Sequence, residues 1–275
     1  MGPSSLPPSF IEVTPLAWRG GELLRTRRAI PEETPIALTF DGSSYAVMMA
    51  TPSDLEDFAV GFALTEDVID APSDVESLEI VEAGGGIEAR MWLSPSVSQR
   101  QRARRRSIVG PTGCGLCGTE SIAQALKPVR TVSSDFKVRP DELAQAMAAL
   151  QASQALNART RAVHAAGLYA DGGIVVREDV GRHNALDKVV GAAMRSGVRA
   201  GNGVVLLTSR VSIELVQKTA KLGAPIMAAI SAPTALAVRV AESAGITLAA
   251  VLRGVDFEVF TYPERIVEEA LAHEG

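Results

Sequence analysis

The sequence predicts an α/β protein in which a three-layer domain with a mixed sheet follows a smaller β-rich part. Two observations carry this prediction. From Ala165 onward, short apolar runs alternate with amphipathic segments of about ten residues, which is the pattern of βαβ crossovers with some parallel strand pairing. Residues 35–51 and 78–93 instead each contain two strand-like runs around a glycine-containing turn, the pattern of a hairpin. The chain of 275 residues is long enough for roughly two domains at most.

The β-rich part also contains a predicted helix between its two hairpins. Thr51-Pro52-Ser53-Asp54 supplies an N-cap at Thr51, a proline at the first helical position and an acid in the first turn. Phe58 and Phe62 follow at helical spacing and give this helix an apolar face. We expect residues 1–20 to form a flexible tail and residues 21–107 to form the β-rich subdomain.

The α/β domain is expected over residues 108–275. A helix is predicted to begin at Pro140, and the unbroken apolar run 203–208 is typical of a strand that is buried on both faces. Ligands of such sheets bind at the carboxyl ends of strands, where Thr208 and Thr234 are expected. Further strands are predicted at 174–177, 225–230 and 247–252, and further helices through Leu186, at 211–222 and at 233–244.

Composition argues against several classes of function. The chain has 27 Lys and Arg against 32 Asp and Glu, so its net negative charge does not favour binding of nucleic acid. Only 4% of its residues are aromatic, so it offers few surfaces on which bases could stack. The longest apolar stretch, 224–238, is interrupted by prolines and falls short of a membrane span. The N-terminus lacks the basic and apolar segments of a signal peptide. We therefore expect a cytoplasmic protein that binds neither nucleic acid nor membrane.

Five arginines lie between Arg100 and Arg106, in a stretch without apolar periodicity that we expect to be a loop. Two interpretations stay open. The run is either a solvated charge cluster without a specific role, or a contact with an anion or a protein partner.

Cys114 and Cys117 lie in a glycine-rich stretch that indicates an exposed loop. A helix that begins near Thr119 would place Cys117 at a positive helix end and favour its thiolate. Such a thiolate can attack a sulfur atom and pass it on. From spacing alone, sulfur or redox chemistry, metal ligation and neither of these stay open.

Metal ligation is the weaker alternative. A closed zinc site needs four ligands, but the chain has no second cysteine pair, and its three histidines, His164, His183 and His273, are far apart in the sequence. None of them is followed by the x-Glu of zinc deaminases. A metal site with an open coordination position, made of Cys114, Cys117 and His183, remains an alternative, although we expect no structural metal.

Residues 178–188 collect charged and polar side chains at a predicted strand-to-helix junction. One interpretation assigns Asn184 to helix capping, and Asp187 with Lys188 to an exposed helix face. The other is functional: Arg182, His183 and Asn184 would donate hydrogen bonds to an anionic or polar ligand at the helix N-terminus.

Four segments, taken together, closely resemble the FdhD/NarQ family of formate dehydrogenase accessory sulfurtransferases. They are TGCGLCG at 112–118, EDVGRHNALDK at 178–188, TSR at 208–210 and FEVFTYPER at 257–265. The eleven residues around His183 are far more specific than the cysteine motif. The similarity runs from about Thr34 to near the C-terminus, and the order and spacing of the segments agree with the family.

The resemblance implies a fold similar to that of cytidine deaminase, a homodimer, and a function as sulfur carrier. The family carries sulfur from a cysteine desulfurase, as a cysteine persulfide, to Mo-bis(molybdopterin guanine dinucleotide), a cofactor that formate dehydrogenase requires. The persulfide is implied to form in the Cys114/Cys117 loop. Cys114 is the favoured carrier, and Cys117 is either a second carrier or a resolving thiol.

The resemblance also implies a cofactor contact at the segment 257–262, whose alternative interpretation is an ordinary edge strand. Arg182, Arg210 and Arg265 are candidate partners of the cofactor phosphates. The residues expected to bind the cofactor are Phe257, Glu258, Val259, Phe260, Thr261, Tyr262, Arg182, His183, Asn184 and Arg210.

The sequence therefore predicts a dimeric sulfurtransferase that acts by nucleophilic, covalent catalysis. Its expected partners are a cysteine desulfurase and formate dehydrogenase. The main alternative is a molybdenum-cofactor chaperone that does not transfer sulfur, and a weaker one is a zinc enzyme related to nucleoside deaminases.

Overall fold

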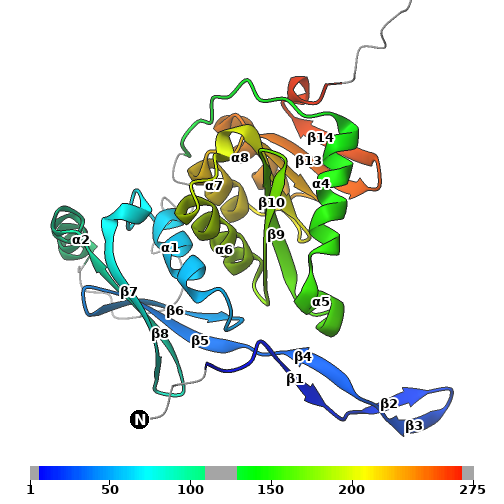
Figure 1. Cartoon of the computed structure of the whole chain (residues 1–275). Helices are drawn as coiled ribbons and strands as arrows, with labels where there is room; N and C mark the ends of the chain where they lie inside the picture. Colours follow the sequence, from blue (N-terminus) through cyan, green and yellow to red (C-terminus); the bar gives the residue numbers. More distant parts are fainter. Residues whose placement is uncertain (1–5, 109–128, 268–275) are drawn as a thin grey trace, which may run out of the picture.

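The computed structural model describes residues 6–108 and 129–267, with side chains for all of these except 103–108. Figure 1 shows a β-rich N-terminal part beside an α/β C-terminal part, with a hairpin arm that extends away from both. The N-terminal elements are β1 (Phe10–Val13), β2 (Leu16–Arg19), β3 (Glu22–Arg25), β4 (Arg28–Pro31), β5 (Thr34–Phe40), β6 (Ser43–Ala50), α1 (Leu55–Thr65), β7 (Val75–Ala83), β8 (Gly86–Leu93) and α2 (Pro95–Ile108).

The C-terminal part contains a six-stranded mixed sheet in the order β10-β9-β11-β12-β13-β14. β11, β12 and β13 are parallel, whereas the outer strands pair in antiparallel fashion, so the predicted mixed α/β architecture is confirmed. Its elements are α4 (Pro140–Ala152), α5 (Ala155–Thr160), β9 (His164–Ala170), β10 (Gly173–Asp179), α6 (Arg182–Arg195), β11 (Gly203–Leu207), α7 (Ile213–Leu222), β12 (Ile226–Ala229), α8 (Ala235–Ala244), β13 (Thr247–Arg253) and β14 (Asp256–Thr261).

Helices cover both faces of this sheet. Val205 and Leu207 belong to the core that includes α6, α7 and α8, whereas Val204 and Leu206 belong to a second core formed with α4. The whole of β11 is buried, which explains its unbroken apolar sequence. None of the described helices is both long and apolar enough to cross a membrane.

The N-terminal sheet has the order β6-β5-β8-β7, and the two predicted hairpins are its outer strand pairs. Alternate residues of β5 and β8, such as Ile36, Leu38 and Met91, pack into the core beside α1. The opposite face of the sheet, which we call the outer face, is exposed at Val47 and Trp92. This sheet is therefore buried on one face only.

The two parts meet where α1 crosses α6. A Cβ atom on Gly61 would lie 1.8 Å from the backbone oxygen of Asp187, and a Cβ on Gly191 would lie 1.9 Å from the backbone oxygen of Asp57. The two helices therefore touch backbone to backbone, and only glycine fits at either position. Asp57 also forms ion pairs with Arg177 and Arg195 across this contact, at 2.7 and 2.6 Å.

Three predictions for the N-terminal part were wrong. Residues 10–13 and 16–19 form β1 and β2 of the arm, so the predicted tail over 1–20 is too long. The arginine-rich stretch belongs to the helix α2, which Gln101 attaches to the backbone oxygen of Val68 at 2.8 Å. Asp54, rather than Thr51, is the N-cap residue of α1. Asp54 adopts a left-handed conformation (φ 52°), and its position places the start of the helix three residues later than predicted. Thr51 therefore has another role.

Candidate functional site

The carboxyl end of the parallel strands carries a group of polar side chains. The antiparallel pairing of β9 and β10 places His164 opposite Asp179, at the same sheet edge at which β11 ends. The Thr208 hydroxyl group, just after β11, accepts a hydrogen bond of 2.9 Å from the backbone nitrogen of Ala165. Three strand ends are thereby brought together where α6 begins.

Buried contacts with Asp179 fix the strand-to-helix junction. Its carboxylate, which is fully buried, accepts hydrogen bonds from the backbone nitrogens of Thr51 (3.0 Å) and Gly181 (2.8 Å). The fully buried Lys188 lies 2.7 Å from the same carboxylate, and it also donates to the backbone oxygen of Thr51 at 2.9 Å. The Thr51 hydroxyl in turn accepts from the Val180 nitrogen at 3.1 Å. The end of β6 therefore holds the N-terminus of α6 in place.

Two predictions for this segment need revision. Asp187 and Lys188 do not lie on an exposed helix face, because both are buried, and Asp187 is paired with Lys218 at 2.8 Å. Asn184 is also buried, and its amide nitrogen donates to the backbone oxygen of Met49 (2.8 Å) and to Asp179 (3.0 Å). This nitrogen therefore serves the junction, and a ligand contact for Asn184 stays a prediction.

Arg182 and His183 form the first turn of α6 beside the start of α7. His183 Nε2 lies 3.5 Å from Ser212 Oγ and 3.8 Å from Glu214 Oε2. Burial, and then the nearby charge of Arg182, lower the pKa of His183 to about 4, so its imidazole is neutral at physiological pH. Arg182 Nε is buried and has no hydrogen-bond partner among the described residues.

His164 completes this cluster from the start of β9. Burial, and then Arg182, also lower its pKa, so two largely neutral imidazoles flank one guanidinium group. Neither Gly181 nor Ser212 caps its helix with a side chain, so the first backbone N–H groups of α6 and α7 add positive partial charge. The arrangement suits an anionic group, or a ligand that accepts hydrogen bonds.

Burial raises the pKa of Glu214, but hydrogen bonds from Ser212 and from its own backbone nitrogen, together with the charge of Arg182, lower it by more. The net effect keeps Glu214 ionised, at the rim of the cluster. No sequence pattern predicted a ligand-binding role for His164, Ser212 or Glu214. The signal that they share is position, since each lies at a strand or helix start on the carboxyl edge of the sheet.

The other predicted contacts are Arg210, two residues before Ser212, and the segment 257–262. Arg210 is exposed in the loop after β11, whereas the segment 257–262 belongs to β14 and its end. β14 is an edge strand with alternating exposure, and its Phe260 is 37% exposed. His183 contacts Ser212, which follows β11, and three strand steps of about 4.8 Å separate β11 from β14, so roughly 14 Å lies between His183 and this strand. Within the described residues of one chain, His183 and β14 therefore do not form a single compact site.

The last residue of β14 and the residues that follow it contact their own domain. The Thr261 hydroxyl donates to the backbone oxygen of Ile246 at 2.7 Å, and the Tyr262 hydroxyl donates to that of Glu242 at 2.6 Å. Arg265 donates to the backbone oxygen of Gly245 at 2.8 Å, and its guanidinium carbon lies 5.4 Å from the centre of the Tyr262 ring. Arg265 is therefore engaged inside the domain.

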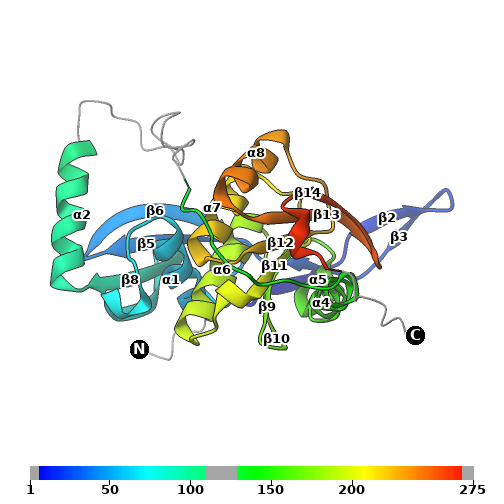
Figure 2. The same cartoon turned by 90° about the horizontal axis from the view of Figure 1, so that it is seen from above.

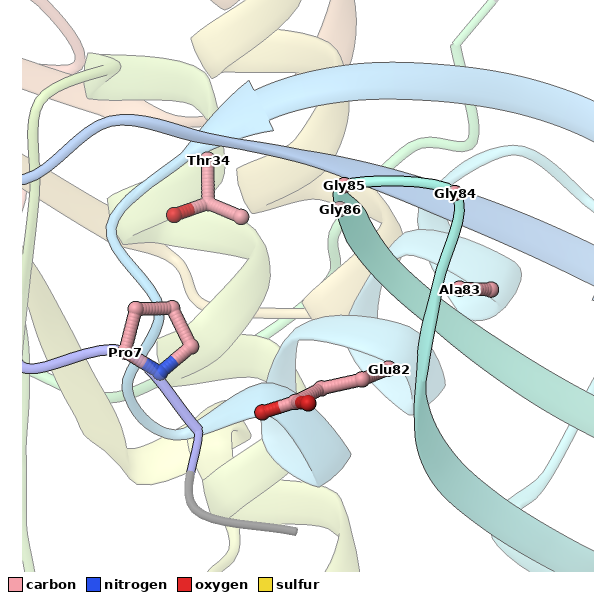
Figure 3. Close-up of a pocket in the computed structure, with 7 residues that line it drawn as sticks. All are labelled: Pro7, Thr34, Glu82, Ala83, Gly84, Gly85 and Gly86. Carbon is pink, nitrogen blue, oxygen red and sulfur yellow. The ribbon is translucent and has the colours of Figure 1, made fainter.

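Cys114 and Cys117 lie outside the described residues, as does most of the predicted loop around them. Within the described part of the chain, no three His, Cys, Asp or Glu side chains group as a metal site would require. A hollow of about 380 Å³ lies at the β7–β8 turn, between Pro7, Thr34, Glu82 and the glycines 84–86 (Figure 3). It contains none of the predicted site residues.

Comparison with known proteins gives a consistent result. The model of the FdhD/NarQ family matches residues 31–267. A relative from Agrobacterium fabrum is 51% identical over 266 residues, which cover 96% of this chain and 98% of the relative. One from Cupriavidus necator is 48% identical and covers 96% and 92%. Both relatives carry the name sulfur carrier protein FdhD.

A solved structure is also similar. It is described as a formate dehydrogenase accessory protein from Desulfotalea psychrophila, and it matches with a TM-score of 0.74 and 26% identity over 94% of this chain and 100% of that one. The fold and the sequence comparisons agree, and the chain belongs to the FdhD/NarQ family.

Proposed function

We propose that this protein is a sulfur carrier for a molybdenum cofactor, on a scaffold similar to that of cytidine deaminase. The observation that carries the proposal is the 51% identity, over 96% of the chain, to a protein named as a sulfur carrier. The proposed donor is a cysteine desulfurase, and the acceptor is Mo-bis(molybdopterin guanine dinucleotide), destined for formate dehydrogenase. The protein would act as a homodimer in the cytoplasm.

The first proposed step is a sulfur exchange at the cysteine pair. The thiolate of Cys114 attacks the terminal sulfur of the desulfurase persulfide, forms a new S–S bond and releases the desulfurase cysteine as a thiolate. The transferred sulfur keeps its oxidation state, so no external oxidant is needed. The same chemistry is open to Cys117, and the experiment below distinguishes the two cysteines.

Delivery to molybdenum requires sulfide, which is two electrons more reduced than the persulfide sulfur. We propose that the second thiolate attacks the inner sulfur of the persulfide, so that a Cys114–Cys117 disulfide forms and HS⁻ leaves to the cofactor, where it replaces a hydroxide or oxide ligand. A cellular dithiol then reduces the disulfide. The two cysteines thereby supply both electrons.

Other residues of the chain hold the cofactor as substrate. The cluster of Arg182, His183 and His164 suits one of its phosphates, because it combines a guanidinium group with neutral imidazole donors and two helix N-termini. Phe260 offers an exposed ring on which guanine or pterin can stack. Because the two places are separated within one chain, we propose that they bind different parts of a long ligand.

The test is the intact mass of the protein after incubation with an active cysteine desulfurase and cysteine, without reductant. We expect a gain of one sulfur atom that a thiol reductant removes, and its loss in one of the variants Cys114→Ala and Cys117→Ala identifies the carrier. If neither the unmodified protein nor either variant gains mass, the sulfur-carrier proposal fails. Activation of formate dehydrogenase that survives loss of both cysteines would then favour a cofactor chaperone.

A further inference from the structure

The arm, residues 10–31, ends in an exposed apolar surface. In the β2–β3 register, Trp18 lies opposite Leu23 and Leu16 lies opposite Arg25, so these four side chains share one face of the hairpin. Trp18 is 70% exposed, Leu23 60% and Leu16 59%. A lone two-stranded hairpin is only marginally stable in water, and apolar side chains of this size are normally covered. The arm therefore has the composition of a docking element.

A second apolar surface lies on the outer face of the N-terminal sheet. Val47 is 52% exposed, Met49 47% and Trp92 37%. Register places Val47 beside Ala37 and Met49 beside Pro35, so the apolar side chains continue from β6 onto β5. The helix α1 packs on the opposite face of the sheet.

The arm and the β7 edge beside the outer face carry opposite charges. Residues 16–28 of the arm contain four exposed arginines and one exposed glutamate. The stretch 66–88, which includes β7, contains eight acidic residues and neither Lys nor Arg. Glu76, Glu79 and Glu82 on β7 are exposed. On the outer face itself, register places Glu79 opposite Arg90, which also pairs with Glu88, so the unbalanced acidic charge lies along the β7 edge that borders this face. An apolar and basic arm thus complements an apolar face with an acidic border.

The arm does not cover its own sheet. Its base lies beside α5, where the guanidinium group of Arg159 is 5.0 Å from the Phe10 ring, and its β2–β3 end continues the direction of β5 away from both parts of the molecule (Figures 1 and 2). From Thr34 to Gly21 the extended chain reaches about 40 Å, whereas the radius of gyration of a 275-residue globule is only about 19 Å. An arm of this length reaches beyond its own body to a neighbouring molecule.

We propose that the arm of each protomer docks on the outer face of the N-terminal sheet of a second copy. Trp18, Leu16 and Leu23 of one protomer would cover Val47, Met49 and Trp92 of its partner, with the arm arginines beside the β7 glutamates. A two-fold axis repeats the contact, so each protomer gives one arm and accepts one. The inference rests on the homodimer in the proposed function and is independent of sulfur transfer.

The experiment uses two variants of the full-length chain that are each defective on one surface. The arm variant, Trp18→Glu with Leu23→Glu, puts acids where the acidic sheet would receive them. The sheet variant, Val47→Lys with Met49→Lys, puts cations beneath the basic arm. Val255→Lys, at a residue that is 67% exposed outside both surfaces, is the matched control. Sedimentation velocity over a concentration series measures association, and circular dichroism checks that each variant is folded.

We expect a dimer for the unmodified protein and for the control, and a dissociation constant at least about 100-fold weaker for each defective variant alone. The equimolar mixture is the decisive sample. A mixed dimer pairs an intact arm with an intact sheet, and it also brings the introduced glutamates to the introduced lysines. Association should therefore return in the mixture, as a heterodimer in native mass spectrometry.

Each contrary result has its own meaning. If both variants dimerise as tightly as the control, the dimer uses another surface, which overturns this inference and leaves the homodimer intact. If the unmodified protein is monomeric throughout the series, the inference and the homodimer both fail. If the mixture associates no better than the separate variants, the two surfaces do not meet. None of these results bears on sulfur loading, which the mass measurement tests separately.

Discussion

His183 illustrates how a few neighbouring side chains determine the chemistry of a residue. Its burial and the charge of Arg182 oppose protonation more strongly than Glu214, at 3.8 Å, favours it. The imidazole therefore acts at physiological pH as a hydrogen-bonding group, while Arg182 supplies the positive charge. The sequence predicted that Arg182 and His183 lie at a helix start. It did not predict their contact with Ser212 and Glu214, because the rest of α6 and the strand β11 lie between these residues in the chain.

A pH dependence of stability follows from this pKa. The folded-state pKa of about 4 lies below the unfolded value of about 6.5, so the unfolded chain binds more protons between these values. Stability falls as the pH decreases through that window. After allowance for solvent screening, the contribution of His183 is about 1–2 kcal/mol.

Urea unfolding at pH 7 and pH 4.5 measures this effect. His183→Gln should lose less stability than the unmodified protein between the two pH values, whereas the loss that arises from His164 persists in both. An equal loss in both proteins would show that the pKa of His183 is not depressed by its surroundings.

Lys188 and Asp179 form a fully buried ion pair. One interpretation of the sequence had placed Lys188 on an exposed helix face. Lys188→Met would leave the Asp179 carboxylate buried without its cation, so we expect a loss of about 3–5 kcal/mol in the free energy of unfolding. Adding Asp179→Asn removes the orphaned charge and should recover part of it. Urea titration of the single and double variants tests both expectations, and a single variant within 1 kcal/mol of the unmodified protein, on the order of a surface change, would contradict the first.

The elements that were predicted correctly are those that bury at least one face. β5, β8 and α4 show apolar periodicity because a core covers one side of each. The arm strands and α2 were missed for the converse reason, since the arm is largely exposed and α2 is arginine-rich. A pattern method that relies on burial detects neither a solvated hairpin nor a polar helix. The Gly20-Gly21 turn was the signal for the hairpin.

The crossing of α1 and α6 yields a prediction for single glycine substitutions. Gly61→Ala places a methyl group where the Asp187 backbone oxygen now lies, and a backbone cannot shift as a side chain does. We expect a loss of about 3 kcal/mol or more in unfolding free energy, and the same for Gly191→Ala. Gly201→Ala is the control, because nothing lies within 4 Å of its added carbon. Equal urea midpoints for Gly61→Ala and Gly201→Ala would refute the close contact.

The whole molecule is more tightly joined than the sequence suggested. Hairpins followed by βαβ units predicted two parts, and the structure contains a four-stranded sheet followed by a six-stranded mixed sheet. What no local pattern encodes is their junction, where Thr51 meets Asp179, Asp57 meets Arg195, and Thr65 donates to Asp187 at 2.7 Å. The residues of each pair are more than 120 positions apart. Pairing over such distances depends on the folded geometry.

This junction predicts a single cooperative unfolding transition. Neither part can separate without breaking buried ion pairs and uncovering the α1–α6 contact, so an intermediate with one part folded would be unstable. Differential scanning calorimetry should give one peak whose van't Hoff and calorimetric enthalpies agree. Two resolved peaks, or a calorimetric enthalpy well above the van't Hoff value, would mean that the parts unfold independently.

The glycine contact also has a consequence during synthesis on the ribosome. Ten of the eleven residues of α1 are buried in the folded protein, and Gly61 precedes its partner Gly191 by 130 positions. At about 5–20 residues per second, translation of that interval takes roughly 6–26 s. For that time the nascent chain carries an apolar helix whose partner does not yet exist. This interval of synthesis is therefore the stage at which the protein most needs a chaperone.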